Sequence, residues 1–513
     1  MKKYKTQMIC LILAIIHICV TFITDRIIFE FPNIGAGNYM TARVDYIICK
    51  IIVFGVLYLF YYGLYLLIVD KSDKHNKIAA IVKTALPYLV VVIGVLLIKL
   101  PGGYITNDEN SIYSNAVTLT HDTWFYYLTT YYYIVSLMLV PFKYGPIIVK
   151  VIIQLWTVGY VVYRIKQYFG NKTGMFGYVL FLLYPVIAYT SSAHRLPVYF
   201  LVYLMIFTKL LFDGLEKKKA SVVDLTCIIV AGAMLTQWRT EGIYLAVFIP
   251  IVCFLTYTNI RNKKGVIYFI IAFVAVQYIV SIPQNGFMAK NLDDAANDRM
   301  KPFYAYTITN MYRNGLDLEK NAEDLAIVDK YISLDVIKAI NEHYVDINYE
   351  DVLILYQEGF VGVRENASVE DFINYSDAVK RIFINNPDVF IKTRWGAFCY
   401  AALPYHINYT GMGVKSLVQL GISVVKTVMY NLFIPTIICV CLCVTSLIRR
   451  KWYSFFVFSG LLAHWFIVFI LAPASYFKYY FPVYIMGYFY LMILAIFIYC
   501  RKAKGTDVFS PLR

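Results

Sequence analysis

The sequence has 513 residues, of which 60% are hydrophobic and 15% carry a charge. This composition excludes an ordinary soluble globular protein, in which about 25% of residues are charged. The net charge of +15 does not indicate a nucleic-acid partner, because the basic residues cluster in short segments between apolar runs, as the positive-inside rule expects of membrane proteins. We therefore predict an all-α polytopic membrane protein that sits in a lipid bilayer and binds no nucleic acid.

The apolar runs predict about 12 transmembrane helices, within a range of about 11–13, because each run is long enough to cross about 30 Å of hydrocarbon. The first run follows the basic segment MKKYK and is interpreted as an uncleaved signal anchor, since it is long for a cleavable signal peptide. The 10 cysteines lie almost wholly inside apolar runs and form no disulfide or metal-binding pattern. The expected spans are residues 8–23, 46–69, 79–100, 146–163, 174–190, 198–213, 221–237, 242–258, 266–282, 417–447, 453–472 and 478–499.

One further segment, Trp124–Val140, is apolar but rich in Tyr and Thr, a composition typical of the membrane interface. If it lies on the surface, 22 Lys and Arg residues fall in cytoplasmic segments and 6 in short outer loops. If it spans the membrane, every later loop changes side and this bias largely reverses. We therefore expect one or two surface helices in the first large outer loop and both termini in the cytoplasm. The short cytoplasmic loops and the richness in Lys, Ile and Tyr favour a bacterial plasma membrane.

This topology divides the chain into four parts, one of which differs in composition. Residues 283–416 would lie outside the cytoplasm, and they hold 19 of the 32 acids but 13 of the 47 bases. Their apolar residues recur with helical periodicity. Ser368 followed by Asp371 resembles a capping box, and Asn386-Pro387 resembles a helix cap followed by proline in the first turn. The predicted parts are 1–78 with two membrane helices, 79–282 with the membrane core and its outer loop 101–145, 283–416 as a mostly helical extracytoplasmic domain, and 417–513 with the last membrane helices and a short cytoplasmic tail.

The uncommon polar residues gather on the outer side of this topology, near the ends of predicted helices. Charges at such depth are costly unless they are paired or hydrated, so they often mark functional sites. More ordinary interpretations stay open for some of them. Lys150 could extend to the membrane interface, as many lysines do, and Arg239 could form a local pair with Glu241. His121 and Asp122 are expected to be loop residues. The outer-side residues of interest are Asp108, Glu109, Lys150, His194, Arg195, Arg239, Glu241 and Lys478.

A carboxylate that faces several cations at the outer membrane surface suits the transfer of a sugar from a polyprenyl phosphate. Negative charge grows on the donor phosphate as the glycosidic bond breaks, and fixed Arg and Lys groups stabilise that charge. Arg also binds phosphate oxygens through paired hydrogen bonds. The acceptor hydroxyl of a glycan, lipid or protein needs a general base within hydrogen-bonding reach. One well-placed carboxylate would serve.

Two short motifs resemble a known group of enzymes. Asn107-Asp108-Glu109, in the first large outer loop after a membrane helix, resembles the acidic motif of the GT-C membrane glycosyltransferases. Among these are the protein O-mannosyltransferases and the aminoarabinose transferases of lipid A. The basic-aromatic-proline run Lys478–Pro482 is similar to a signature at the start of a late span, where many members have Arg in place of Lys478. The resemblance covers mainly residues 79–282 and 470–499.

The resemblance implies an inverting glycosyltransferase with an extracytoplasmic active site. Asp108 would be the base or would orient the acceptor, and Glu109 would support it or help to bind a divalent cation. A metal requirement stays open, because two adjacent acids fall short of a full ligand set. The residues that would hold the donor phosphate are Arg195, Arg239 and Lys478, and those expected to support the site are His194, Glu241 and Lys150.

Two other classes of protein stay open. A transporter or flippase for lipid-linked saccharides could also line a cavity with Arg and Lys, although such proteins more typically show internal repeats or broken helices near the membrane midplane. Flipping without covalent transfer would favour this class. A non-catalytic protein could present residues 283–416 for cell-envelope assembly, and donor binding that survives the loss of Asp108, Arg195 and Arg239 would favour that interpretation.

Overall fold

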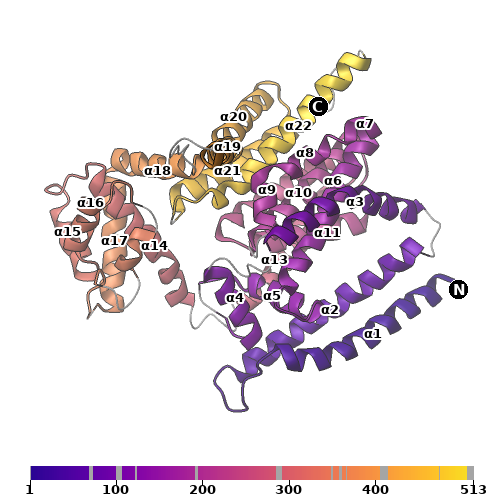
Figure 1. The fold of residues 1–513 in the computed structure, drawn as a ribbon, viewed down its shortest axis with the longest axis horizontal. Helices are drawn as coiled ribbons and strands as arrows, with labels where there is room; N and C mark the ends of the chain where they lie inside the picture. Colours follow the sequence, from indigo (N-terminus) through magenta and orange to yellow (C-terminus); the bar gives the residue numbers. More distant parts are fainter. Residues whose placement is uncertain are drawn as a thin grey trace. The chain divides into compact units, whose positions relative to one another are not determined.

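The computed structural model describes residues 2–68, 73–99, 107–121, 124–190, 195–284, 292–347, 350–356, 361–365, 367–404, 414–472 and 474–504. Within these residues every regular element is a helix, and an isolated bridge joins Ile332 to Val363. The all-α class predicted from the sequence is therefore confirmed for the described part of the chain (Figure 1). The chain divides into two compact units, each treated by itself below. Unit 1 comprises Met1–Ala289, Ile437–Leu461 and Tyr484–Arg513, and unit 2 comprises Lys290–Thr436 and Leu462–Val483.

Unit 1 begins with two long helices that lie side by side, α1 (Lys2–Ile28) and α2 (Tyr39–Ile68) (Figure 1). Both also pack against α5 (Tyr127–Leu139). Residues such as Cys49 of α2 and Tyr133 of α5 are fully buried in the hydrophobic core that these helices share. The N-terminal helix pair is thus packed onto the first loop helices through a continuous apolar contact.

The segment Trp124–Val140, expected as surface helices, contains the single helix α5. This helix has 13 residues, which corresponds to about 20 Å at 1.5 Å per residue. That length is short of the about 30 Å needed to cross hydrocarbon. The loop helix before it is α4 (Asn107–Thr118). The short length of α5 supports the surface location, which stays a prediction.

The helix α3 (Asp73–Lys99) packs closely against α6 (Gly145–Phe169). A Cβ atom at Gly159 would lie 2.5 Å from the carbonyl oxygen of Ile81. Small residues at helix contacts allow such backbone approach in membrane proteins. Any larger residue at Gly159 would push the two helices apart.

The run 174–190, expected as one membrane span, is not one continuous helix. It is divided into α8 (Gly177–Leu182) and α9 (Tyr184–Thr190), with Leu183 between them at ψ 129°. Pro185 accounts for the break, because proline has no N–H to donate to the carbonyl four residues earlier and its ring clashes with that carbonyl.

The carbonyl that Pro185 leaves without its helical donor belongs to Phe181. The hydroxyl of Tyr88 on α3 donates a hydrogen bond to this oxygen at 2.9 Å. The side-chain amide of Gln154 on α6 donates to the same hydroxyl, also at 2.9 Å. A buried polar network therefore satisfies the broken helix and ties three helices together.

A second buried network lies near the end of α10 (Leu196–Leu215). Asp213 is 2% exposed and accepts hydrogen bonds from Arg164 at 3.0 Å, from Lys209 at 2.9 Å and from the Tyr257 hydroxyl at 2.7 Å. Buried charges persist in proteins when they are paired and hydrogen-bonded in this way. The network ties the end of α10 to α6 and to the segment after α12 (Leu245–Thr256).

The other helices with residues in unit 1 are α7 (Asn171–Gly174), α11 (Val222–Thr236), η1 (Thr240–Tyr244), η2 (Thr258–Ile260), α13 (Lys263–Ile282), α20 (Phe433–Ile448), α21 (Trp452–Leu471) and α22 (Phe481–Lys504).

Nine helical segments in the described residues are long and apolar enough to cross a membrane. This finding supports a bilayer environment, but the expected count of about 12 is not confirmed. The run 174–190 is broken, and the helices at Val222–Thr236 and Thr240–Thr256 are apolar but shorter. The nine segments are Thr6–Ile28, Tyr39–Ile68, Lys77–Ile98, Gly145–Phe169, Leu196–Leu215, Lys263–Ile282, Leu417–Ile448, Trp452–Leu471 and Phe477–Cys500.

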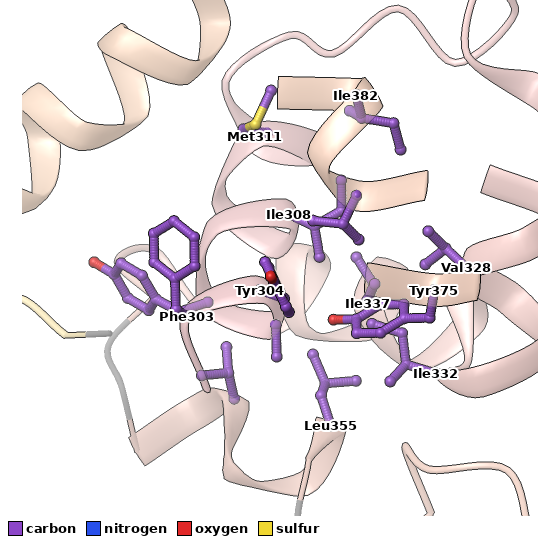
Figure 2. Close-up of a cluster of buried hydrophobic side chains, with 14 of the residues drawn as sticks. Phe303, Tyr304, Ile308, Met311, Val328, Ile332, Ile337, Leu355, Tyr375 and Ile382 are labelled. Carbon is purple, nitrogen blue, oxygen red and sulfur yellow. The ribbon is translucent and has the colours of Figure 1, made fainter. Parts of the chain in front are cut away.

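Unit 2 holds a helical core of its own (Figure 2). Aromatic and branched side chains such as Phe303, Tyr375 and Ile382 pack together there. The unit includes residues 417–436 and 462–483 in addition to most of 283–416, and the extracytoplasmic location of this part stays a prediction. Its helices are α14 (Leu292–Arg313), α15 (Ala322–Tyr331), α16 (Leu334–His343), η5 (Glu350–Leu355), α17 (Val369–Asn385), α18 (Pro387–Ala402), α19 (Val414–Met429) and η6 (Phe477–Tyr480).

One of the two predicted side-chain caps of unit 2 is present. The Ser368 side chain accepts a hydrogen bond from the Asp371 backbone, and the Asp371 side chain accepts one from the Ser368 backbone. This reciprocal pair is the predicted capping box. Pro387 occupies the first turn of α18 after Asn386, as expected, although the Asn386 side chain bonds Asn321 and Ile382 instead of capping α18.

One buried cation of unit 2 was not singled out in the sequence. Arg394 on α18 is 1% exposed, and its guanidinium donates to the carbonyl oxygens of Phe469 at 2.7 Å and Ala472 at 2.8 Å. These carbonyls lie at the end of α21, where the helix dipole is negative and its last carbonyl groups have no intrahelical donor. Arg394 therefore caps α21 with a charged side chain from another helix.

Candidate functional site

The acidic pair lies in the first turn of α4, where the helix dipole favours negative charge. Successive residues of a helix point about 100° apart, so the two carboxylates face different surroundings. The side chain of Glu109 is 2% exposed, whereas that of Asp108 is 40% exposed. One carboxylate is thus enclosed by protein, and its neighbour stays accessible.

Arg195 reaches both acids from the N-cap position of α10. Its Nη1 atom donates to Glu109 Oε1 at 2.8 Å, and its backbone N–H donates to the same oxygen at 3.4 Å. Its Nη2 atom lies 3.6 Å from Asp108 Oδ2, a distance of ion pairing beyond a normal hydrogen bond. Three of the residues predicted for the site therefore contact one another.

The ring of Phe125 supports this cluster, because the Arg195 guanidinium lies 4.7 Å from its centroid. A cation over an aromatic ring is attracted by the negative face of the ring. The Arg195 side chain is 17% exposed. The contacts with Glu109 and Phe125 together fix its orientation.

The second predicted pair is also present. Arg239 is the N-cap residue of η1, and its Nε atom donates to the Glu241 carboxylate, with both side chains 13% exposed. The local-pair interpretation left open for these residues is therefore correct as a description of their contact.

The segment between α4 and α5 contacts Arg195 and the residue that lies between Arg239 and Glu241. Phe125 packs against Arg195, and the hydroxyl of the next residue, Tyr126, donates to Thr240 Oγ1 at 3.2 Å. Thr240 lies between Arg239 and Glu241 in the sequence. Sequence reasoning missed Phe125, Tyr126 and Thr240, because in an aromatic run next to a membrane helix they resemble ordinary interface residues.

The other predicted site residues are placed as follows. Lys150 on α6 is 1% exposed, so its side chain is buried in the protein. Lys478 lies in η6 of unit 2, with Nζ 4.8 Å from the Tyr476 ring and 5.8 Å from the Tyr479 ring. Its membership of the site stays a prediction. His194 lies outside the described residues.

His121 lies in the segment between α4 and α5, as expected of a loop residue, but its side chain is buried and paired, while Asp122 lies outside the described residues. The His121 side chain is 6% exposed and its Nε2 atom lies 2.9 Å from Oδ2 of Asp45 on α2. Its ring stacks on Tyr127 at a centroid distance of 3.5 Å. The Tyr131 hydroxyl donates to the other oxygen of Asp45 at 2.6 Å. Burial, followed by the charge of Asp45, raises the pKa values of Tyr127 and Tyr131, so both phenols remain neutral near neutral pH.

Two chemical roles are open to the Asp108 cluster. An exposed carboxylate next to a fixed guanidinium can accept a proton from a bound hydroxyl, and the guanidinium can bind an oxyanion. Among the described residues no three His, Cys, Asp or Glu side chains come together as a metal-binding group. Comparisons of the chain with protein-family models, with curated proteins and with solved structures found no match.

Proposed function

We propose that this chain is a membrane glycosyltransferase that moves a sugar from a polyprenyl-phosphate donor to an acceptor outside the cytoplasm. The observation that supports this proposal best is the contact of Arg195 with both Asp108 and Glu109, which leaves Asp108 the more exposed of the two acids. The cluster lies at the start of α10, a helix of 20 residues. At about 30 Å, α10 is long enough to cross the membrane and would present the cluster at one interface.

In the proposed reaction Asp108 is the general base. Its carboxylate takes the proton of the acceptor hydroxyl while that oxygen forms a bond to the anomeric carbon of the sugar. The bond between the anomeric carbon and the phosphate oxygen breaks, and its electron pair stays on the phosphate. Attack opposite the leaving group inverts the configuration at this carbon. A phosphate leaving group needs no strong general acid, so one base suffices.

Glu109 has a different role in this proposal. It is enclosed and bonded to both the side chain and the backbone of Arg195, so we assign it as a positioning residue. By holding the guanidinium in one orientation, it would reduce the reorganisation needed when charge develops on the phosphate. Glu109 is not expected to exchange protons with the substrate.

The charges of the Arg195 and Arg239 clusters bear on how a phosphate could bind there. Arg195 faces two carboxylates and Arg239 faces one, so these groups together carry three negative and two positive charges. A phosphate would therefore need additional positive charge at the site. The sequence motif implies Lys478 for this role, and a divalent cation held by the acidic pair is the alternative. Addition of Mg²⁺ or of a chelator to the assay distinguishes these two sources.

The proposed topology places the active site outside the cytoplasm of a plasma membrane, with about 12 crossings and both termini inside. The charge bias of the short loops supports this orientation. Cysteine accessibility measured in intact cells tests it: a single Cys at Asn110, beside the acidic pair, should react with a membrane-impermeant maleimide. A Cys at Lys218, in the loop after α10, should react only after the cells are opened.

Mass spectrometry of surface glycans and lipid-linked sugars from a deletion strain would identify the substrates. The proposal expects one missing sugar and an accumulated polyprenyl-phosphate donor. With these substrates, the purified Asp108→Asn variant should fold normally and lose transfer. The matched control is Asp335→Asn, since Asp335 lies in the first turn of α16 and should be dispensable. Full turnover by Asp108→Asn would show that Asp108 is not the base. Flipping of the donor without covalent transfer in proteoliposomes would show that the protein is a flippase and not a transferase.

A further inference from the structure

Unit 1 contains a pocket that is separate from the Asp108 cluster. It lies between the ends of α10 and α20, the first half of α21 and the middle of α22. Counted together with its open mouth, the space is ≈ 720 Å³.

The walls of this pocket are apolar, whereas one part of its rim is basic. Leu215 of α10, Phe458 of α21 and Leu494 of α22 are among the wall residues, and Arg449 and Lys451 contribute to the same lining. Among the lining residues that the structure describes, none is acidic. The pocket therefore combines a surface for a hydrocarbon chain with two basic residues beside it.

The end of α20 sets the positions of the two cations. The backbone N–H of Lys451 bonds the carbonyl of Ser446 at 2.8 Å, and Arg450 has a φ of 53°. These features form a Schellman motif, in which one left-handed residue reverses the chain after a helix. Trp452 follows with 49% exposure, and tryptophan is enriched at the membrane–water interface. The basic rim is thus held at a helix end that suits the interface.

The pocket and the Asp108 cluster lie at opposite ends of α10. Arg195 immediately precedes the helix and Leu215 is its last residue, so about 30 Å of helix separates them. If α10 spans the membrane, the two sites face opposite leaflets. A ligand of the pocket would therefore not be the donor bound at Asp108.

We infer that this pocket binds an anionic phospholipid from the bilayer. One acyl chain would lie between α10, α21 and α22, and the phosphate would contact Arg449 and Lys451. A soluble anion would not use the apolar walls. A zwitterionic lipid would gain less from two adjacent cations than a lipid with net negative charge. This inference does not depend on the proposed transferase activity, because binding can be measured without any substrate.

Native mass spectrometry of the full-length protein in detergent tests this inference, with phosphatidylglycerol and phosphatidylcholine as probes. We expect one phosphatidylglycerol to bind more tightly than phosphatidylcholine. The double variant Arg449→Gln with Lys451→Gln should weaken phosphatidylglycerol binding about thirtyfold. Leu494→Trp, which fills the pocket and keeps its charges, should weaken binding of both lipids. Thermal unfolding without added lipid checks that each variant is folded.

The matched control is Lys263→Gln with Lys264→Gln, which removes the same charge from exposed residues at the start of α13. This pair should leave phosphatidylglycerol binding unchanged. An equal loss in the control would mean that binding follows net charge alone, and would overturn the inference. Equal affinity for the two lipids would overturn it as well, as would competition by inorganic phosphate at the same concentration as the lipid.

Discussion

Arg195 Nη1 lies 2.8 Å from Glu109 Oε1, although 86 positions separate the two residues in the chain. Glu109 has lost nearly all its contact with solvent, while the neighbouring Asp108 keeps 40% exposure of its side chain. A carboxylate enclosed in this way depends on its partner for charge compensation. The two acids of the motif therefore differ in exposure and in charge compensation, and we expect their substitutions to have different effects.

Glu109→Gln should destabilise the protein more than Asp108→Asn does. Loss of Glu109 leaves the mostly enclosed Arg195 without its closest charge partner, and breaking such a pair costs about 3 kcal/mol. Asp108 forms a longer and more exposed contact, so its replacement should cost less than about 1 kcal/mol. Thermal unfolding of the three purified proteins in one detergent measures both effects. Equal losses of stability would contradict the separate roles.

Arg195→Lys should lower transfer activity about a hundredfold while leaving the protein folded. Lysine keeps the charge but cannot reproduce the planar guanidinium that contacts Glu109, Asp108 and Phe125 together. The loss should fall mainly on kcat, because the misplaced cation stabilises the leaving phosphate less in the transition state. Steady-state kinetics with the substrates identified in the deletion strain measure it. Lys217→Arg, in an exposed turn, is the control and should change neither constant.

Tyr88→Phe should reduce stability by about 1–2 kcal/mol, because it removes the hydroxyl that satisfies the carbonyl of Phe181. It also leaves the Gln154 amide without the acceptor to which it donates. Tyr268→Phe removes a hydroxyl from a residue that is 68% exposed and should have no measurable effect. The unfolding temperatures of the two variants give the comparison. A neutral Tyr88→Phe would mean that the break at Pro185 is satisfied in another way.

Asp45 and His121 should show coupled effects in a double-mutant cycle. Their side chains contact each other at 2.9 Å, and residues in direct contact show interaction energies of about 0.5–3 kcal/mol. The cycle uses Asp45→Asn and His121→Gln, with unfolding temperature and proteolysis of the α1–α2 pair as readouts. Asp45→Asn combined with Tyr268→Phe should be additive, because the Tyr268 side chain is 68% exposed whereas Asp45 is fully buried. Additivity for the first pair would show that their contact does not stabilise the fold.

Ser368→Ala should lower stability by about 1 kcal/mol at neutral pH, the usual cost of losing an N-cap side chain. Hydrogen bonds from the Ser368 hydroxyl and backbone lower the pKa of Asp371 below its ordinary value of 3.8. Because that pKa is depressed in the folded state, its contribution is present above pH 3.8 and disappears as the pH falls through the folded pKa.

The difference between wild type and Ser368→Ala should therefore shrink in acid. Unfolding measured between about pH 7 and pH 3 tests this. Ser376→Ala is the control, since the Ser376 hydroxyl bonds the carbonyl of Ile373 and no carboxylate. Its effect should not change with pH through this interaction. A constant difference for Ser368→Ala would show that the Asp371 carboxylate does not contribute to the cap.

Local patterns were enough to predict several elements. Ser368 and Asp371 lie three residues apart, so their capping box depends on one helical turn alone. The long apolar runs indicated membrane-length helices for the same reason. The run 174–190 was predicted wrongly as a single helix, because its apolar length was given more weight than Pro185. That proline could have been used to predict the break.

Other features have no local pattern. The pairing of His121 with Asp45 was not predicted, because Asp45 lies 76 positions earlier in the chain. The contacts of Phe125 with Arg195 and of Tyr126 with Thr240 join segments that no spacing rule relates. Arg394 similarly finds its acceptors at the end of α21, 75 and 78 positions away. Such pairs become visible only when helices pack.

The sequence by itself determined the helical membrane class and drew attention to Asp108, Glu109 and Arg195, because apolar length and misplaced charge are properties of composition along the chain. Only the tertiary structure decided that Glu109 is enclosed with Arg195 and that Asp108 stays accessible. The physical reason is that exposure and charge compensation depend on what the neighbouring helices place around each carboxylate. Two adjacent acids are equivalent in the sequence, and packing makes them different.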